Sequence, residues 1–329
     1  MPSLKRSVSA LALVGIGLAG LNAFVRSAAA KREDVDLATE EVPGSYLDVD
    51  GQRIHYVETG QGDAVLLLHG WNGSTFSMRR TIPDLAHRYR VVAIDLPGYG
   101  FSSRSENADY STSAQADVVR SVLDRLQIDR AAAVLGHSMG GGVAMQLALR
   151  HPERVERLVL VSSVTPSETR RVRRLGFMRP FIPLFGLTLV REFIVRRALL
   201  GVAHDPAFVT QNVVDGYFRP LRVKGHLRSQ AKQMADRQHE EAYEPRQIHQ
   251  PTLILHGEHD RVIPLSTGRA LAEQIPNAQP EVIRGAGHLA LEEQPEECNK
   301  LLLEFLSRPV NETLAASSNG AVRESRSMV

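Results

Sequence analysis

The chain has 329 residues, 43% of them hydrophobic, and this length and composition suffice to bury the core of a full α/β domain. Lysine and arginine together number 39 against 37 acidic residues, so the net charge gives no indication of a nucleic-acid partner. The single cysteine, Cys298, excludes an intramolecular disulfide.

The first 30 residues are predicted to be a membrane anchor or a signal-like segment. Residues 8–25, VSALALVGIGLAGLNAFV, form a run of 18 residues without a charge, which reaches the lower range for a membrane-spanning helix. This run predicts a retained single-pass anchor and a membrane location. The alternative is export after signal cleavage near Ala30, where small residues end the segment. Residues 31–44 are then predicted to be a polar linker.

A backbone donor is expected after the first buried strand. The stretch AVLLLHGWNGST at 64–75 begins with an apolar run typical of a buried strand and continues with the turn His69-Gly70. A main-chain N–H in such a turn can bind an oxyanion, and Trp71 is the candidate donor. The alternative is that Trp71, the only tryptophan, serves packing alone.

Residues 131–148, AAAVLGHSMGGGVAMQLA, predict a strand, a sharp turn and a helix. The pattern Gly-x-Ser-x-Gly places Ser138 on the turn, between Gly136 and Gly140. The helix amino terminus behind the turn carries partial positive charge and free N–H groups, which favour an oxyanion. Ser138 is therefore the predicted nucleophile, and the N–H of Met139 is the second predicted oxyanion donor. The alternative is a glycine-rich turn whose serine only caps the helix.

Residues 166–244 are about the size of a helical lid inserted between two strands. Within them, the stretch 170–201 holds eight arginines against one glutamate and four of the chain's ten phenylalanines. Such a mixture suits a surface that lies against anionic lipid headgroups. The alternative is an ordinary lid with solvated arginines. Both interpretations predict an apolar substrate pocket.

Two later strand ends supply an acid and a base. PTLILHGEHDRVIP at 251–264 predicts a strand and then a turn that presents Asp260, and EVIRGAGHLALEEQP at 281–295 predicts the same for His288. A serine nucleophile needs a base, and the base needs an orienting acid. The chain order Ser138, Asp260, His288 therefore predicts a catalytic triad.

Competing interpretations exist at both turns. Asp260 is alternatively a turn-forming residue, His288 a surface histidine, and Glu258 the orienting acid. Three further histidines lie near these strand ends: the side chain of the one before the nucleophile is expected to point away from the hydroxyl, and the two that share the turn of the acid do not form a familiar metal-ligand spacing, so no metal is expected. They are His137, His256 and His259.

Six segments resemble the α/β-hydrolase superfamily: LLLHGWNGS (66–74), RVVAIDLPGYGFSS (90–103), LGHSMGGGVA (135–144), HPERVERLVLVSS (151–163), PTLILHGEHDRVIP (251–264) and GAGHLALEEQPEE (285–297). The resemblance implies an α/β fold with a mostly parallel eight-stranded sheet, helices on both faces, and a helical lid after the sixth strand. The core is then expected at 45–165 and 245–308, the lid at 166–244, and a disordered tail at 309–329. One departure is Asn72-Gly73, because many relatives carry proline after the aromatic residue of the His-Gly segment.

The same resemblance suggests the chemistry. Serine at the nucleophile position points to ester or lipase activity, because the dehalogenase and epoxide-hydrolase branches carry aspartate there. The hypothesis is a membrane-tethered serine hydrolase that cleaves carboxylic esters with an apolar acyl chain, such as a monoacylglycerol, through an acyl-enzyme. The alternatives are a carbon–carbon bond hydrolase, a cofactor-independent haloperoxidase-like esterase, and a non-catalytic ligand-binding relative. No cofactor and no nucleic acid are expected. The expected partners are the ester and, through the amino-terminal segment and in one interpretation the lid, a membrane.

Overall fold

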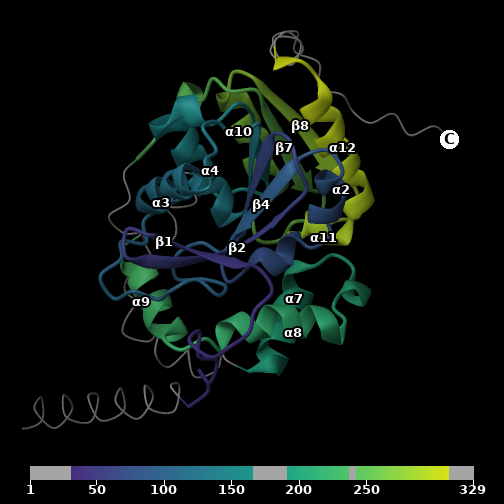
Figure 1. Cartoon of the computed structure of the whole chain (residues 1–329). Coiled ribbons are helices and arrows are strands. Elements are labelled where there is room, and N and C mark those ends of the chain that lie inside the picture. The colour runs from purple at the N-terminus through teal and green to yellow at the C-terminus, as the bar shows by residue number, and fades with distance from the viewer. Residues whose placement is uncertain (1–30, 166–190, 237–241, 311–329) are drawn as a thin grey trace, which may run out of the picture.

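The structure, a computed structural model, describes residues 31–165, 191–236 and 242–310 (Figure 1). Eight strands form one sheet in the order β1-β2-β4-β3-β5-β6-β7-β8. All neighbours from β4 to β8 are parallel, whereas β1 and β2 run antiparallel to their neighbours. The predicted mostly parallel eight-stranded sheet is confirmed. The strands are β1 (Ser45–Val49), β2 (Gln52–Thr59), β3 (Ala64–Leu68), β4 (Arg90–Ile94), β5 (Ala133–His137), β6 (Leu158–Val161), β7 (Thr252–Gly257) and β8 (Ala278–Ile283).

Helices cover both faces of this sheet (Figure 1). Leu66 and Leu68 of β3 belong to the apolar cluster of one face, and Val65 and Leu67 belong to that of the other. Side chains alternate along a strand, so a strand that is apolar at every position needs cover on both sides. The helices of the first face are α3 (Thr112–Arg125), α4 (Met139–Arg150) and α10 (Leu265–Gln274), and those of the second are α2 (Ile82–Ala86) and α12 (Pro295–Ser307).

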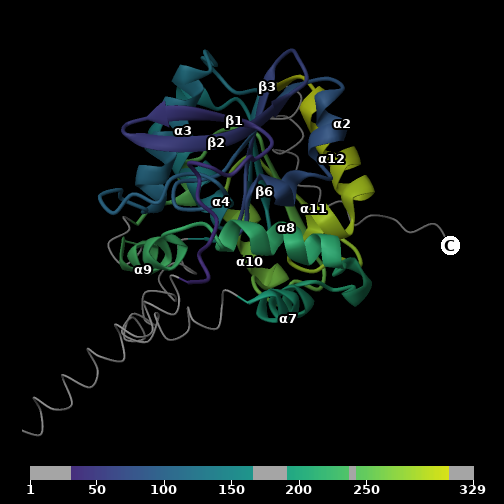
Figure 2. The same ribbon diagram turned by 60° about the horizontal axis from the view of Figure 1, so that its bottom comes forward.

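Between β6 and β7 the described residues form helices α7 (Glu192–Val202), α8 (Gln211–Leu221) and α9 (His226–Asp236), which we term the insertion. Figure 2 shows α7 and α8 along one end of the molecule, close to the short helix α11 (Ala290–Glu293). The insertion lies within the predicted lid range, and its role as a lid stays a prediction. The short 3-10 helices are η1 (Thr75–Met78), η2 (Pro152–Arg154), η4 (Pro206–Phe208) and η6 (Pro245–Gln247).

Residues 33–43, within the predicted linker, pack against the insertion, and we term them the strap. Val35 forms a parallel bridge with Val223, and its amide donates to the carbonyl of Arg222 at 3.1 Å. The carboxylate of Asp34 accepts hydrogen bonds from the Arg222 guanidinium, 188 residues later in the chain. The polar residues of the predicted linker are thus complementary in charge to a distant segment.

The predicted membrane anchor is corrected. No helix among residues 31–165, 191–236 and 242–310 is both long and apolar enough to cross a bilayer. The longest of them, α3, has 14 residues and is about 21 Å long, against about 30 Å for the hydrocarbon core. The run 8–25, the cleavage site near Ala30, most of the basic stretch 170–201 and nearly all of the tail lie outside the described residues. The membrane tether and the membrane location are therefore dropped from the functional hypothesis.

Candidate active site

Ser138 lies on the predicted turn between β5 and α4. Its φ of +52° falls in a region that L-residues rarely adopt. The flanking glycines make room for the turn. A Cβ at Gly136 would come within 2.3 Å of the carbonyl oxygen of Gly140, and a Cβ at Gly140 within 2.4 Å of that of Leu68. The turn therefore requires glycine at both fixed positions of the Gly-x-Ser-x-Gly pattern.

Main-chain hydrogen bonds hold the unusual backbone of Ser138. Its amide donates to the carbonyl of Val161 at 2.9 Å, and its carbonyl accepts from the amides of Gly141 and Val164 at 3.0 Å each. Its side chain makes no capping hydrogen bond to α4, which argues against a serine that only caps the helix. The hydroxyl is therefore not needed to build the turn.

The structure brings the side chains of Ser138, His288 and Asp260 together. Nε2 of His288 lies 3.0 Å from Oγ of Ser138, and Nδ1 lies 2.8 Å from Oδ2 of Asp260. Because a carboxylate can only accept, Nδ1 carries the proton, and in the neutral ring the lone pair of Nε2 faces the hydroxyl. A general base needs this arrangement.

The environment of Asp260 keeps its carboxyl group ionised. Asp260 is 8% exposed, and His288 and Ser138 are each 7% exposed. Burial alone would raise the pKa of the Asp260 carboxyl. Hydrogen bonds from His288 and from the amides of Ile263 and Val262 outweigh that effect and hold the pKa below its usual value. Asp260 can therefore orient the His288 ring and stabilise positive charge on it.

The turn after β3 lies against the predicted nucleophile. A Cβ at Gly70 would stand 2.9 Å from Nδ1 of His137 and 3.1 Å from the Cβ of Ser138, so a larger residue here would displace one of these side chains. Trp71 follows, with 48% of the residue exposed, so it is not a core packing residue. Asn72 has a φ of +55°, which proline cannot adopt, and this accounts for the departure from the family pattern. Met139 is the first residue of α4. The oxyanion role of Trp71 and Met139 stays a prediction.

His137 contacts the base in a way that the sequence did not reveal. Its Nε2 donates to the backbone carbonyl of His288 at 2.8 Å, and the two ring centroids lie 5.0 Å apart. Burial, followed by the proximity of the His288 ring, lowers the pKa of His137 to about 3, so the ring is a neutral donor. His137 is the last residue of β5, and the turn that carries His288, which we term the base turn, lies next to this strand end. This position is the signal in the sequence that points to such a contact.

Of the other candidates, His256 lies beside the acid, with its Nε2 3.6 Å from Oδ2 of Asp260, whereas Glu258 and His259 contact other groups. The carboxylate of Glu258, the alternative acid, accepts from the amide of Gly285 at 3.3 Å and lies 3.5 Å from His259. His256 donates from Nε2 to the carbonyl of Ile263 at 2.8 Å. Within the part of the chain that the structure describes, no group of three or more His, Cys, Asp or Glu side chains is arranged to hold a metal ion.

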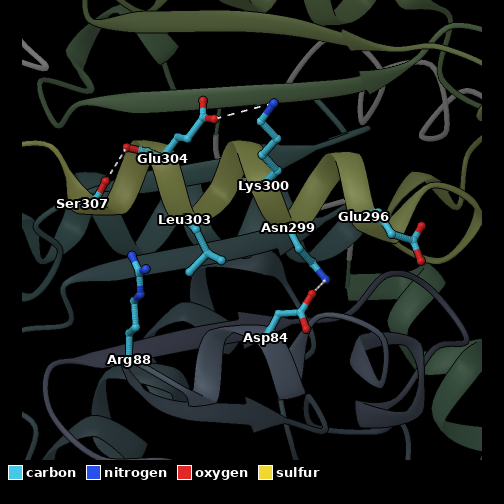
Figure 3. A pocket seen from close by; sticks show the side chains of 8 residues that line it. All are labelled: Asp84, Arg88, Glu296, Asn299, Lys300, Leu303, Glu304 and Ser307. Carbon is cyan, nitrogen blue, oxygen red and sulfur yellow. Dashed lines mark hydrogen bonds and ion pairs between the residues drawn. The ribbon is translucent and has the colours of Figure 1, made fainter.

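A surface hollow lies between α2 and α12 (Figure 3), and none of its lining residues belongs to the Ser138 cluster. Side chains of both charges line it, among them Asp84, Arg88 and Lys300. Asn299 donates to Asp84 at 2.7 Å and so links the two helices at this hollow. The hollow is thus separate from Ser138, Asp260 and His288, and we assign it no function.

Comparisons with known proteins identify the family of the fold. A family profile described as alpha/beta hydrolase fold matches residues 63–295. The uncharacterized hydrolase YugF of Bacillus subtilis is 31% identical over 265 residues, which are 78% of this chain and 96% of that protein. The 2-hydroxy-6-oxononadienedioate/2-hydroxy-6-oxononatrienedioate hydrolase of Escherichia coli K12 is 32% identical over 295 residues, 82% of this chain and 98% of that protein. A solved variant of the meta-cleavage product hydrolase CumD of Pseudomonas fluorescens IP01 is 29% identical, with a TM-score of 0.67 covering 79% of this chain and 96% of that one.

Proposed function

The chain belongs to the alpha/beta hydrolase fold family, and we propose that it is a serine hydrolase that cleaves a bond to a substrate's carbonyl carbon. In this proposal Ser138 is the nucleophile, His288 the general base and acid, and Asp260 the orienting acid. The observation that carries it is the hydrogen-bonded chain from Asp260 through His288 to Ser138, with distances of 2.8 and 3.0 Å. Such a chain activates a weak nucleophile for attack on a carbonyl.

The first half of the proposed reaction forms an acyl-enzyme. Nε2 of His288 takes the hydroxyl proton while Oγ of Ser138 bonds to the carbonyl carbon, and Asp260 stabilises the imidazolium. The N–H groups of Trp71 and Met139 bind the negative oxygen of the tetrahedral intermediate. His288 then gives its proton to the leaving group as the bond between that group and the carbonyl carbon breaks.

The second half releases the acid and restores the enzyme. A water molecule gives a proton to His288 while its oxygen bonds to the acyl carbon, and the proton returns to Ser138 as the acyl–oxygen bond breaks. The hydrogen bond from His137 to the backbone carbonyl of His288 supports the main chain that carries the ring, while Asp260 orients the ring itself.

A carbon–carbon bond is the first candidate for the bond that is cleaved, because the named relatives favour it. One hydrolyses 2-hydroxy-6-oxononadienedioate or the corresponding trienedioate, and the other is a meta-cleavage product hydrolase. Cleavage of a carbon–carbon bond beside a ketone leaves an electron pair on carbon, so the substrate itself must delocalise that pair until His288 protonates it. We infer a ketone whose leaving carbon is conjugated to a second carbonyl group.

A carboxylic ester with an apolar acyl chain is the second candidate. An alkoxide leaving group needs only the proton that His288 supplies, so the same three side chains suffice. Trp71, itself a predicted oxyanion donor, is 48% exposed on the turn after β3. Val262 is 46% exposed on the turn that carries Asp260. Exposed apolar side chains at these turns suit an apolar acyl chain.

The test combines active-site labelling with a substrate panel. A fluorophosphonate probe should label the wild-type protein at Ser138 and leave Ser138→Ala unlabelled, while the control Ser121→Ala on α3 is labelled normally. Turnover of 2-hydroxy-6-oxo dienoate ketones is compared with that of p-nitrophenyl esters of graded acyl length. Ser138→Ala should lose at least about a thousandfold in turnover of the preferred class. A wild-type protein that is neither labelled nor active on either class would be a ligand-binding relative, and the proposal would fail.

A further inference from the structure

A buried carboxylate lies close behind the base turn. Glu292 is on α11, four residues after His288, and 2% of its side chain is exposed. Its two oxygens contact the guanidinium of Arg79 and the hydroxyl of Tyr217. Burial raises the pKa of the Glu292 carboxyl, and it raises that of the Tyr217 hydroxyl well above its usual value. The hydroxyl therefore keeps its proton and acts as the donor.

The partners of this carboxylate come from different segments. Arg79 is the C-cap of η1, which follows the turn that carries Trp71, whereas Tyr217 lies on α8 of the insertion. The Arg79 guanidinium stacks over the ring of Phe76 at 4.0 Å, and that ring meets the Tyr217 ring edge-on at 5.9 Å. We refer to Phe76, Arg79, Tyr217 and Glu292 as the joint. The joint connects α8 of the insertion with α11, which follows His288, and with η1, which follows the turn that carries Trp71.

The next residue, Glu293, fastens the base turn to the insertion. Its Oε1 accepts from the amide of Gly287 at 3.0 Å, and its Oε2 accepts from that of His204 at 2.6 Å. The amide of His288 donates to the carbonyl of Val202 at 3.0 Å. A Cβ at Gly287 would come within 2.6 Å of that carbonyl oxygen, so the base turn and the end of α7 touch backbone to backbone.

We infer that Glu292 is a positioning residue that couples the seating of the insertion to the alignment of His288. This inference rests on the proposed function, because it concerns the base of that reaction. Tyr217 links α8 to the Glu292 carboxylate, and Arg79 links the end of η1 to it. His288 precedes Glu292 by only four residues, so the base turn is joined to both contacts through a short piece of chain. Without the shared carboxylate, His288 loses part of the support that places Nε2 3.0 Å from Oγ of Ser138. An ion pair with a purely structural role would change stability and leave that alignment intact.

The experiment compares two joint variants with matched controls in the full-length protein. Tyr217→Phe removes one hydroxyl, and Glu292→Gln removes one charge at nearly constant shape. The controls Tyr89→Phe and Glu296→Gln make the same chemical changes outside the joint. The readouts are the second-order rate constant for fluorophosphonate labelling of Ser138, scaled to the folded fraction from circular dichroism, and kcat and KM on the preferred substrate. Both joint variants should lose about tenfold in labelling rate and in kcat, with KM changed by less than about twofold.

The outcomes separate this inference from the proposed function. Wild-type labelling rates in the joint variants, or a loss no larger than the loss of folded protein, would overturn the positioning role. If Glu292→Gln fails to fold, Tyr217→Phe decides, because it removes a single oxygen atom. A wild-type protein that the probe does not label would instead overturn the proposed function.

Discussion

The joint and the strap both fasten the insertion to the rest of the chain through arginine–carboxylate pairs, but water reaches them very differently. In the joint, the side chains of Glu292 and Arg79 are 2% and 23% exposed. In the strap, Asp34 and its partner Arg222 are 52% and 37% exposed. Exposed pairs are worth about 0–1 kcal/mol and are weakened by salt, whereas removing one partner of a buried pair leaves a desolvated charge. The joint should therefore be sensitive to mutation and the strap to ionic strength.

The largest effect on stability is expected from Arg79→Leu, which leaves the buried carboxylate of Glu292 without its cation. The free energy of unfolding in urea at neutral pH should fall by about 3 kcal/mol. The double variant Arg79→Leu/Glu292→Leu should recover most of this loss, because the desolvated charge is removed as well. If Arg222→Leu, which removes the exposed pair with Asp34, lowers the free energy of unfolding as much as Arg79→Leu does, burial does not explain the difference between the two pairs.

The pH dependence of stability provides the next test, because the insertion and the core each bury a neutral histidine. Burial, with Arg104 nearby, lowers the pKa of His226 to about 3, and burial beside His288 does the same for His137. In the unfolded chain a histidine has a pKa of about 6.5. The folded value is the lower one, so the unfolded chain takes up protons first as the pH falls. The stability these residues contribute is complete above about pH 6.5 and is lost toward pH 3.

Each of these histidines should reduce the free energy of unfolding by up to about 1.4 kcal/mol per pH unit across that range. Urea unfolding of the wild type at pH 6.5 and pH 5 should therefore include a loss of about 1.6 kcal/mol from His226 alone. His226→Gln should remove this part of the pH dependence, and His87→Gln, at an exposed position, should not. An unchanged slope in His226→Gln would show that the histidine titrates alike in the folded and unfolded chain.

The sequence was most informative where the chemistry is local. The turn that carries Ser138 needs glycine at 136 and 140 because neighbouring backbone leaves no space for a Cβ, and both lie within a few residues of the serine. Apolar runs such as that of β3 indicated buried strands, and the resemblance of six segments to the α/β-hydrolase superfamily supplied the eight-stranded sheet. Asp260 could be located because it lies in the turn after the buried strand β7, and His288 because it lies in the glycine-containing turn after β8.

The contacts of the joint and the strap could not be predicted from the sequence, because they join residues far apart in the chain. Arg79 and Glu292 are 213 residues apart in the chain, and Asp34 and Arg222 are 188 apart. With 39 basic and 37 acidic residues in the chain, charge alone does not select such pairs. The packing of α8 against η1 and α11 selects the first pair, and that packing is a property of the assembled fold.

A smaller effect is expected from Glu33→Gln, which tests burial within the strap itself. Glu33 is 9% exposed, and its carboxylate accepts from the amides of Gly225 and Leu227 at 2.9 and 2.7 Å, at the start of α9. A carboxylate there satisfies free N–H groups and lies at the positive end of the helix dipole. The variant should lose about 1 kcal/mol of unfolding free energy in urea. A cost equal to that of Asp34→Asn would show that burial does not set the strength of strap contacts.

The smallest effect is expected from Asp34→Asn. The hydrogen bond from Arg222 holds the pKa of the Asp34 carboxyl below its usual value, but both side chains are partly exposed, so water and salt screen the pair. The variant should lose less than about 0.5 kcal/mol at low ionic strength and nothing measurable in molar salt. Urea unfolding at both salt concentrations checks this, with Glu33→Gln as the buried control. If Asp34→Asn costs the same in both, the bridge between Val35 and Val223, rather than exposed charge, holds the strap.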